Sequence, residues 1–287
     1  DSSNIVIENL ISNSNGNQSI NNKDGFGVVF HLSNNIESNG KNVSCTNCSS
    51  INDAFGGIYI EDSIDLYLKN IHVYEPRNDG YGIYANNRGL SQKGYLNING
   101  ALLELNRSSA IIEINGAAKL NDLNIQGNQN NGYGLFLNGT SNGDISFLNN
   151  SLINSKKCIN FSNLITNGNE LICNGEVTIF NSNINISNLE AINKLNLIIN
   201  IEDGNSLLRL HKPINIDLSL SYIEVGSKIE EAYDIEIWVK NQYQNRLPFS
   251  NVDIQFTYFN NDFSITTDYL GKGVMKNFIV REWSTGF

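Results

Sequence analysis

The chain has 287 residues and a formal net charge of -10 at pH 7, with only 17 % charged residues. This length allows one large domain or two ordinary ones, and 40 % hydrophobic residues can form a core. The acidic balance argues against nucleic acid and anionic membrane surfaces as partners, because both attract clusters of Lys and Arg. No run of about 18 apolar residues is present, so we expect no membrane insertion.

A short hydrophobic strand pattern, entered through a small residue, recurs along the first part of the chain. The steps between copies are roughly 24 to 30 residues, and a strand repeated at such a period is typical of a solenoid. The copies lie at residues 24–30, 54–60, 79–85, 108–114 and 131–137, with a weaker copy at 157–161.

A second strand pattern interleaves with the first. Its first and third residues are mostly apolar, and its fifth residue is Asn or Gly, so one face of each strand should point inward. Like strands are a full repeat apart, which predicts a coil of parallel strands rather than a series of hairpins. The copies are residues 5–9, 43–47, 66–70, 96–100, 123–127, 145–149 and 177–181.

The fifth position of this pattern suits a sharp corner. Asn tolerates left-handed backbone angles and Gly adopts them freely. In successive turns the Asn side chains would stack about 4.8 Å apart and could hydrogen-bond along the axis. The alternative is coincidence, because the chain contains about fifty Asn.

We expect an all-β protein with two domains. Residues 1–225 are predicted to form a right-handed parallel β-helix of about seven to eight rungs, the rungs lying between residues 25 and about 200. Residues 226–232 are expected to be a short helical or irregular linker, and residues 226–287 a small Ig-like β-sandwich. This domain has predicted strands at 234–240, 252–258, 263–267 and 273–280, with turns at 241–245 and 268–271.

Two stretches carry resemblances to known families. Residues 57–63, followed by 66–70, resemble the β-helix repeats of the pectate-lyase-like superfamily, in particular archaeal cell-surface proteins. Residues 237–241, 247–252 and 266–271 resemble Ig-like modules of the carboxypeptidase-regulatory type, which commonly follow β-helices in archaeal envelope proteins. The resemblance implies a fold but no single activity, since the superfamily includes lyases, hydrolases, tailspikes and adhesins. Four strands are fewer than the about seven of such a sandwich, so we expect an incomplete module or one completed by a neighbouring subunit.

Acidic and basic residues of the repeats were considered as a sugar-cleaving site, which needs paired carboxylates, or acids with a basic residue, on one outer face. Neither of two loose groups matches the Asp-Asp, His-Gly or calcium-and-Arg arrangements of the superfamily. We therefore predict solvated surface charge, no catalytic, cofactor-binding or metal-binding residue, and no enzyme. The groups are Glu61, Asp62, Asp65 and Lys69, and Glu75, Arg77, Asp79 and Arg88, with His31, His72 and His211 scattered.

The four cysteines are too few for a disulfide scaffold. Cys45 and Cys48 lie more than a hundred residues from Cys158 and Cys173, so the spacing disfavours a zinc site. Outside the cell, Cys158 and Cys173 could form a disulfide, because they lie about one short rung apart. The equal alternative is that both are small core residues.

Several Asn residues begin an Asn-x-Ser/Thr sequon and could carry glycans in a secreted protein, although so Asn-rich a chain contains such triplets by chance. Asn17 and Asn138 are predicted in loops, whereas Asn149 lies in the predicted ladder and is a poor acceptor. The candidate glycosylation sites are Asn17, Asn42, Asn47, Asn106, Asn138, Asn160 and Asn185.

Aromatic residues recur beside the repeat glycines and could stack along one wall. An exposed Tyr stripe would suit sugar binding, whereas a buried one would fill the core or line a corner, which we favour. The residues are Phe26, Phe55, Tyr59, Tyr81, Tyr84, Tyr133 and Phe136.

Together these patterns favour an extracellular structural protein of the cell surface, self-assembling into a filament, sheath or surface layer. The partner would be the protein itself, by end-to-end stacking or strand exchange. The first residue is Asp1, so we expect a processed form, with its signal peptide removed, or a segment of a longer chain. The alternative function is a glycan-binding adhesin, and a polysaccharide lyase or hydrolase ranks third.

Overall fold

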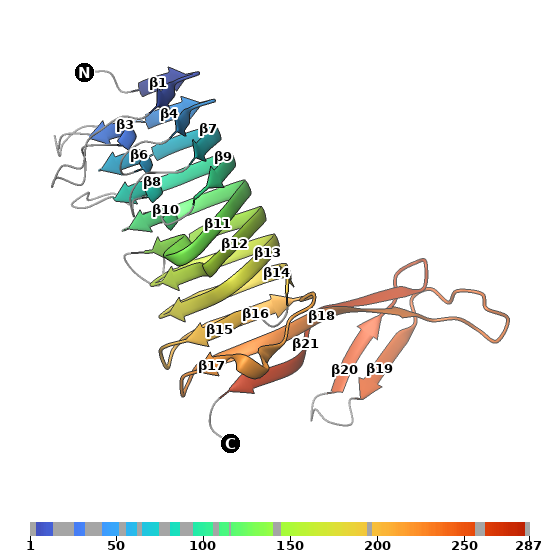
Figure 1. Cartoon of the computed structure of the whole chain (residues 1–287). Helices are drawn as coiled ribbons and strands as arrows, with labels where there is room; N and C mark the ends of the chain where they lie inside the picture. Colours follow the sequence, from blue (N-terminus) through green and yellow to red (C-terminus); the bar gives the residue numbers. More distant parts are fainter. Residues whose placement is uncertain are drawn as a thin grey trace, which may run out of the picture. The chain divides into compact units, whose positions relative to one another are not determined.

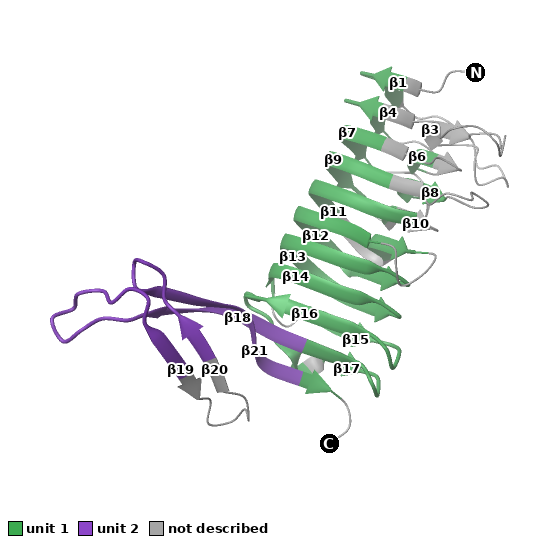
Figure 2. Ribbon diagram, turned by 180° about the vertical axis from the view of Figure 1, so that it is seen from behind, with its two compact units in different colours: residues 1–229, 283–287 green, residues 230–282 purple. Residues whose placement is uncertain are grey.

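The computed structural model consists almost entirely of β-strands and divides into two compact units. The first comprises residues 1–229 and 283–287, and the second residues 230–282 (Figure 2). The structure describes residues 4–13, 26–31, 42–51, 56–61, 65–74, 81–86, 94–105, 109–114, 116–139, 145–193, 197–255 and 262–284.

The first unit is a parallel β-solenoid of about 6 turns, in which every strand pairs with its equivalent one turn away (Figure 1). Three walls surround one core. The first wall stacks β1 (Asn4–Glu8), β4 (Asn42–Thr46) and the first segments of β7 (Asp65–Tyr74), β9 (Gly94–Glu104), β11 (Gly116–Asn138), β12 (Ile145–Ser162), β13 (Ile165–Phe180) and β14 (Asn183–Ala191), followed by β16 (Leu207–His211).

The other two walls are built by the remaining segments of the same turns. The second wall stacks β2 (Ile11–Asn13), β5 (Ser49–Ile51) and the second segments of β7, β9, β11, β12, β13 and β14. The third wall stacks β3 (Phe26–His31), β6 (Gly56–Glu61), β8 (Tyr81–Asn86), β10 (Ser109–Ile114), the last segments of β11, β12 and β13, β15 (Ile198–Ile201) and β17 (Tyr222–Ile223).

The predicted parallel coil is therefore confirmed, with one more wall than the two strand patterns indicated. Between residues 25 and 200 the first wall contains β4, β7, β9, β11, β12, β13 and β14. These are seven stacked strands, the lower bound of the expected seven to eight rungs, compared with the about 6 turns of the coil.

The core of the coil is a continuous column of aliphatic side chains. Alternate residues point inward, so that β12 buries Leu148, Ile153 and Phe161 completely while their neighbours face outward. The same inward positions repeat in the next turns and join one hydrophobic cluster along the coil. Burial of a Leu or Ile side chain stabilises by roughly 1.5–3 kcal/mol, so this column supplies the main driving force for folding.

The corner between the first and second walls is made by one left-handed residue per turn. Asn9, Asn47 and Asn70 have φ of 56°, 54° and 52°, and Gly100 has φ of 81°. The predicted Asn or Gly corner is thus confirmed for these turns. Strand register continues the column through Asp122, Asn150, Glu170, Asn188 and Lys212, all with positive φ.

Amide side chains bond from turn to turn along this corner. Asn47 Nδ2 donates to Asn9 Oδ1 at 2.9 Å, and Asn70 Nδ2 donates to Asn47 Oδ1 at 3.1 Å. The expected hydrogen-bonded Asn ladder therefore exists. A Cβ added at Gly100 would lie 3.0 Å from Asn70 Oδ1, so glycine continues the corner without crowding the last amide.

Two further ladders were not predicted. Asn163 Nδ2 donates to Asn138 Oδ1 at 3.1 Å, and Asn181 Nδ2 donates to Asn163 Oδ1 at 2.9 Å. At the corner after the second wall, Asn154 Nδ2 donates to Gln126 Oε1 at 3.3 Å, and Asn174 Nδ2 donates to Asn154 Oδ1 at 2.9 Å.

Three predicted copies of the second pattern were misplaced: residues 123–127 lie on the second wall, residues 177–181 lie on the third wall, and one copy is one residue out of register. The pattern put Ile145 and Phe147 inside and the corner at Asn149, but these two side chains are 46 % and 39 % exposed. The structure instead buries Ser146 and Leu148 and turns at Asn150, whose φ is 45°. A shift of one residue exchanges the two faces of a strand, and here the apolar side chains on the outer face misled the pattern.

The second unit contains β18 (Lys228–Trp238), β19 (Asn251–Gln255), β20 (Asp262–Thr266) and β21 (Lys272–Ser284), the first and last of which begin or end in the solenoid unit. β19 and β20 are antiparallel, and Glu236 pairs with Lys272 while Glu231 pairs with Arg281, so β18 and β21 also run antiparallel. The four predicted strands are present. The predicted linker at 226–232 is wrong, because β18 starts at Lys228, whose backbone N–H bonds to Ser206 O and continues the stack.

Both predicted turns of this unit are closed by acidic or amide side chains. Asn241 Oδ1 accepts from the backbone N–H groups of Tyr243 and Asn245. Asp268 Oδ1 accepts from those of Leu270 and Lys272. Such side-chain caps mimic a backbone turn and explain why Asn and Asp start these loops.

Replacement of Asn163 tests the corner mechanism. Asn163→Ala should lower the free energy of unfolding by about 2 kcal/mol, because alanine loses both ladder bonds and is strained at φ of 55°. Asn163→Gly should cost less, about 1 kcal/mol, because glycine accepts this angle. Urea denaturation measures both. Asn167→Ala, at an exposed position of β13, is the matched control, and a larger loss for glycine than for alanine would contradict the mechanism.

Candidate functional site

A shallow groove of about 350 Å³ runs along the outside of the first wall. Its polar side chains come from β4, β7, β9 and β11, which lie in successive turns (Figure 1). We call it the first-wall groove. Its lining residues are Thr46, Tyr67, Leu68, Lys69, Asn97, Ile98, Asn99, Lys119 and Asn121.

The first-wall groove is basic although the protein is acidic. Lys69 and Lys119 are exposed, and no carboxylate lines the groove among the described residues. Tyr67, on the same strand as Lys69, is 47 % exposed and presents an aromatic ring to the groove. Ammonium, amide and aromatic groups together can hold a carboxylate or a chain of hydroxyl groups.

A larger groove of about 530 Å³ follows the second wall and the Asn corner. We call it the second-wall groove. Glu170 and Glu190 are its charged members, and among the described residues no Lys or Arg lines it. Apolar side chains form its floor and end, with Ile214 46 % exposed. Its lining residues are Leu123, Asn124, Asn150, Ser151, Leu152, Glu170, Ile172, Asn188, Glu190 and Ile214.

Aromatic side chains stack on the third wall. The rings of Tyr59 and Tyr84 are stacked nearly parallel with centroids 5.2 Å apart, and the Tyr81 ring centroid lies 4.9 Å from that of Tyr84. One turn apart in register, they form the expected stack. Tyr59 is only 8 % exposed, however, so this stack is not an open platform for a sugar.

Two other tyrosines of this wall, Tyr133 and Tyr222, lie close to charged side chains. Tyr133 lies 5.3 Å from Phe136, with Lys157 Nζ 4.9 Å from the Tyr133 ring centre. Near the end of the wall, the Glu224 carboxylate accepts a hydrogen bond from the Tyr222 phenol and raises its pKa. Phe26 starts β3, and Phe55 lies outside the described residues.

The first group of charged residues weighed as a sugar-cleaving site lies where the third wall of one turn leads into the first wall of the next. Glu61 ends β6 and Asp65 starts β7, with Lys69 four residues further along the first wall. Asp62 and the whole group of Glu75, Arg77, Asp79 and Arg88 lie outside the described residues.

The three histidines lie on three different walls and form no common centre. His31 is on β3, His72 on β7 and His211 on β16. His72 Nε2 lies 3.1 Å from Glu104 Oε2 on the neighbouring turn, a half-exposed pair. Within the described ranges, no three His, Cys, Asp or Glu side chains gather as metal ligands. No helix of the described chain has the length and apolar character to cross a membrane.

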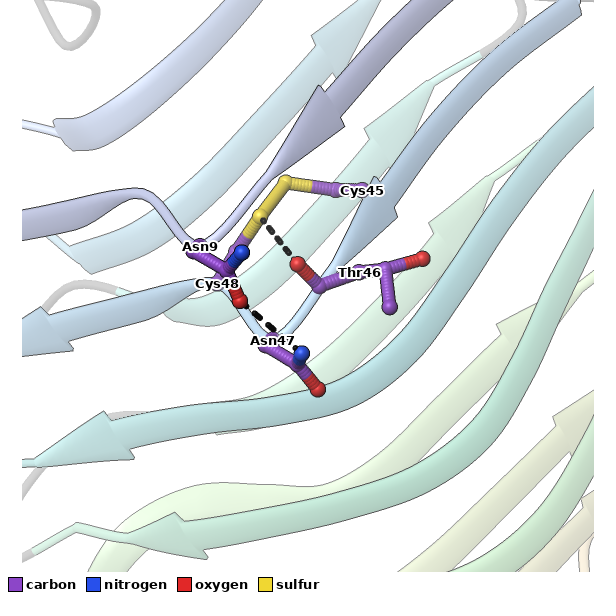
Figure 3. The surroundings of a disulfide bond; sticks show 5 residues. All are labelled: Asn9, Cys45, Thr46, Asn47 and Cys48. Carbon is purple, nitrogen blue, oxygen red and sulfur yellow. Dashed lines mark hydrogen bonds between the residues drawn. A yellow bond between two sulfur atoms is a disulfide. The ribbon is translucent and has the colours of Figure 1, made fainter.

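The structure pairs all four cysteines. Cys158 and Cys173 form a disulfide between β12 and β13, with Cα atoms 6.2 Å apart and both side chains fully buried. A second disulfide, not expected from the sequence, joins Cys45 to Cys48 across the Asn47 corner, with Cα atoms 6.0 Å apart (Figure 3). Cys48 Sγ also lies 3.7 Å from the Thr46 carbonyl oxygen. Cys-x-x-Cys was the only local signal for this bond.

The sequons differ in their surroundings. Asn185 is exposed on β14, whereas Asn160 is only 8 % exposed. Asn47, Asn138 and Asn149 belong to amide ladders, and Asn138 ends β11 rather than lying in a loop as predicted. Asn42 starts β4, and Asn17 and Asn106 lie outside the described residues.

Comparisons with known proteins add no relative. No protein-family model, curated protein or solved structure matches the chain.

Both grooves were missed by the sequence reasoning. Lys69 was weighed only with nearby acids, and Lys119, Glu170 and Glu190 drew no attention. Residues 20 or more positions apart in the chain, such as Glu170 and Glu190, become neighbours only through the strand register. A signal existed in principle. Tyr67, Asn97 and Lys119 occupy the same outward column once the turns are aligned.

The two disulfides should contribute unequally to stability. Cys158→Ala/Cys173→Ala opens a loop with a sequence separation of 15 and should cost about 3 kcal/mol of unfolding free energy. Cys45→Ala/Cys48→Ala opens a separation of only 3 and should cost about half as much. Denaturant unfolding under oxidising conditions measures both pairs. The reduced wild type is the control, and equal losses would contradict the loop argument.

Proposed function

We propose that the protein is an extracellular structural protein of the cell surface that self-assembles into a filament, sheath or surface layer. The observation that carries the proposal is the number of large apolar side chains exposed along the outer walls of a rigid coil. Large exposed apolar surface on a soluble protein marks association sites. Examples of such exposed side chains are Val6, Ile11, Tyr67, Ile145, Phe180 and Ile214.

The disulfides support an extracellular location. Buried disulfides persist in oxidising compartments and are rare in reducing ones. Cys45 and Cys48 are 0 % and 1 % exposed, and Cys158 and Cys173 are both 0 % exposed. Within this proposal, Asn185 is the best placed glycan acceptor, because it is an exposed sequon residue outside the ladders.

The ladders support a mechanical role. Each turn is tied to its neighbours by backbone hydrogen bonds on three walls and by amide side chains at the corners. We expect these bonds between neighbouring turns to oppose bending and local opening of the coil, as a mechanical role requires.

The second unit fits the proposal as a module of the Ig-like, carboxypeptidase-regulatory type that follows β-helices in archaeal surface proteins. Its described strands are β18, β19, β20 and β21, fewer than the about seven of a complete sandwich. On this proposal, further strands come from a neighbouring copy by β-augmentation or from a longer chain.

Electron microscopy of the purified protein in neutral buffer, without added sugar, tests the assembly. We expect regular filaments or sheets at micromolar concentration, and particles that grow with concentration in sedimentation velocity. Dispersed monomers at all concentrations would overturn the proposal.

Glycan binding is the second candidate, favoured by exposed Tyr67 within the amide-lined first-wall groove. An adhesin would be retained on a polysaccharide affinity column, and Tyr67→Ala should reduce its affinity about tenfold by removal of the stacking ring. Tyr269→Ala, 71 % exposed in the second unit, is the matched control. Absence of retention of the wild type would exclude this candidate.

A further inference from the structure

We infer that the first-wall groove of one copy binds the second-wall groove of another, so that the two grooves are the two halves of one interface. The inference rests on the proposed self-assembly and specifies the surfaces that carry it. It requires that the grooves be complementary in charge, accessible and unable to pair within the same copy.

The charges of the two grooves are opposite. Lys69 and Lys119 are exposed in the first-wall groove and have no carboxylate partner among the described residues. Glu170 and Glu190 in the second-wall groove have no cationic partner there either. The chain has a net charge of -10, so its surface is acidic on average. A groove whose described residues include two lysines and no carboxylate differs from that average.

The separations of the charges are compatible. Lys69 on β7 and Lys119 on β11 are two turns apart, which is about 10 Å along the axis. Glu170 on β13 and Glu190 on β14 are one turn apart, about 5 Å. The long Lys side chains can span the difference, and a rim of ion pairs around apolar contacts is the usual anatomy of an interface.

Apolar groups lie beside the charges on both sides. Tyr67 in the first-wall groove and Phe147 on the same outward column are 47 % and 39 % exposed. Ile214 in the second-wall groove is 46 % exposed and lies in one outward column with half-buried Leu152 and Ile172, next to Glu190. Their contact would remove these side chains from water in both copies.

The grooves cannot meet within one molecule, because they lie on adjacent walls and face away from each other across the Asn corner. Asp122 stands on this corner, where its Oδ1 accepts from Asn150 Nδ2 at 3.4 Å. Contact between two different surfaces is heterologous, and a heterologous contact that does not close into a ring continues as a filament.

Charge reversal provides the test. Lys69→Glu/Lys119→Glu makes both grooves acidic, and Glu170→Lys/Glu190→Lys makes both basic, so each variant alone should associate at least about tenfold more weakly than the wild type. Lysine is tolerated at the left-handed position of Glu170, since Lys212 has φ of 54° in the same column. Lys156→Glu/Lys276→Glu, two exposed lysines outside the groove, gives the same charge change as the first variant and should leave association unchanged.

Mixing distinguishes the proposed interface from a general charge effect. An equimolar mixture of the two variants pairs acidic grooves with basic ones on both sides and should recover wild-type assembly in sedimentation velocity and electron microscopy. Circular dichroism and thermal unfolding of each variant confirm that it is folded. Recovery in the mixture, with neither variant assembling alone, supports the interface.

Two other results would overturn the inference and separate it from the proposed function. If the wild type assembles and both reversed variants assemble equally well, the interface is wrong while self-assembly stands. If the wild type remains monomeric at all concentrations, self-assembly and the interface fail together.

Discussion

The structure depends on strict register between turns. Each inward side chain must meet the inward side chain of the next turn, as Leu120 and Leu148 do within the core column. The left-handed residue between the first and second walls maintains this register, because it bends the chain at the same point of each turn. An amide ladder then adds a directional bond between corners. Register, rather than any single contact, is therefore what allows one core to extend through the whole coil.

The same constraint creates the outer surface. Outward side chains also fall into columns, so that residues far apart in the chain share one groove. Lys69 and Lys119 are brought together in this way, as are Glu170 and Glu190 on the next wall. A solenoid thus presents long, rigid and chemically distinct strips, which suit repetitive partners such as other copies of the chain or a polysaccharide.

The disulfides reinforce the coil at two kinds of position. Cys45–Cys48 staples a corner within one turn, whereas Cys158–Cys173 joins two successive turns through the core. Both positions restrict how the turns can separate. Both bonds form and persist only in an oxidising environment, so the stability that they add depends on that environment.

The sequence by itself determined the class of fold, the left-handed corner residues of the first four turns and the strands and turns of the second unit. Each of these follows from a local pattern, such as the Asn at the fifth position or the side chains of Asn241 and Asp268 that cap their own turns. The tertiary structure alone decided the third wall, the register around Asn150, the Cys45–Cys48 bond and both grooves. Except for the Cys45–Cys48 bond, which lies within one turn, these features depend on which residues of different turns become neighbours. Loops of unequal length hide that alignment in the sequence, and only the stacked strands reveal it.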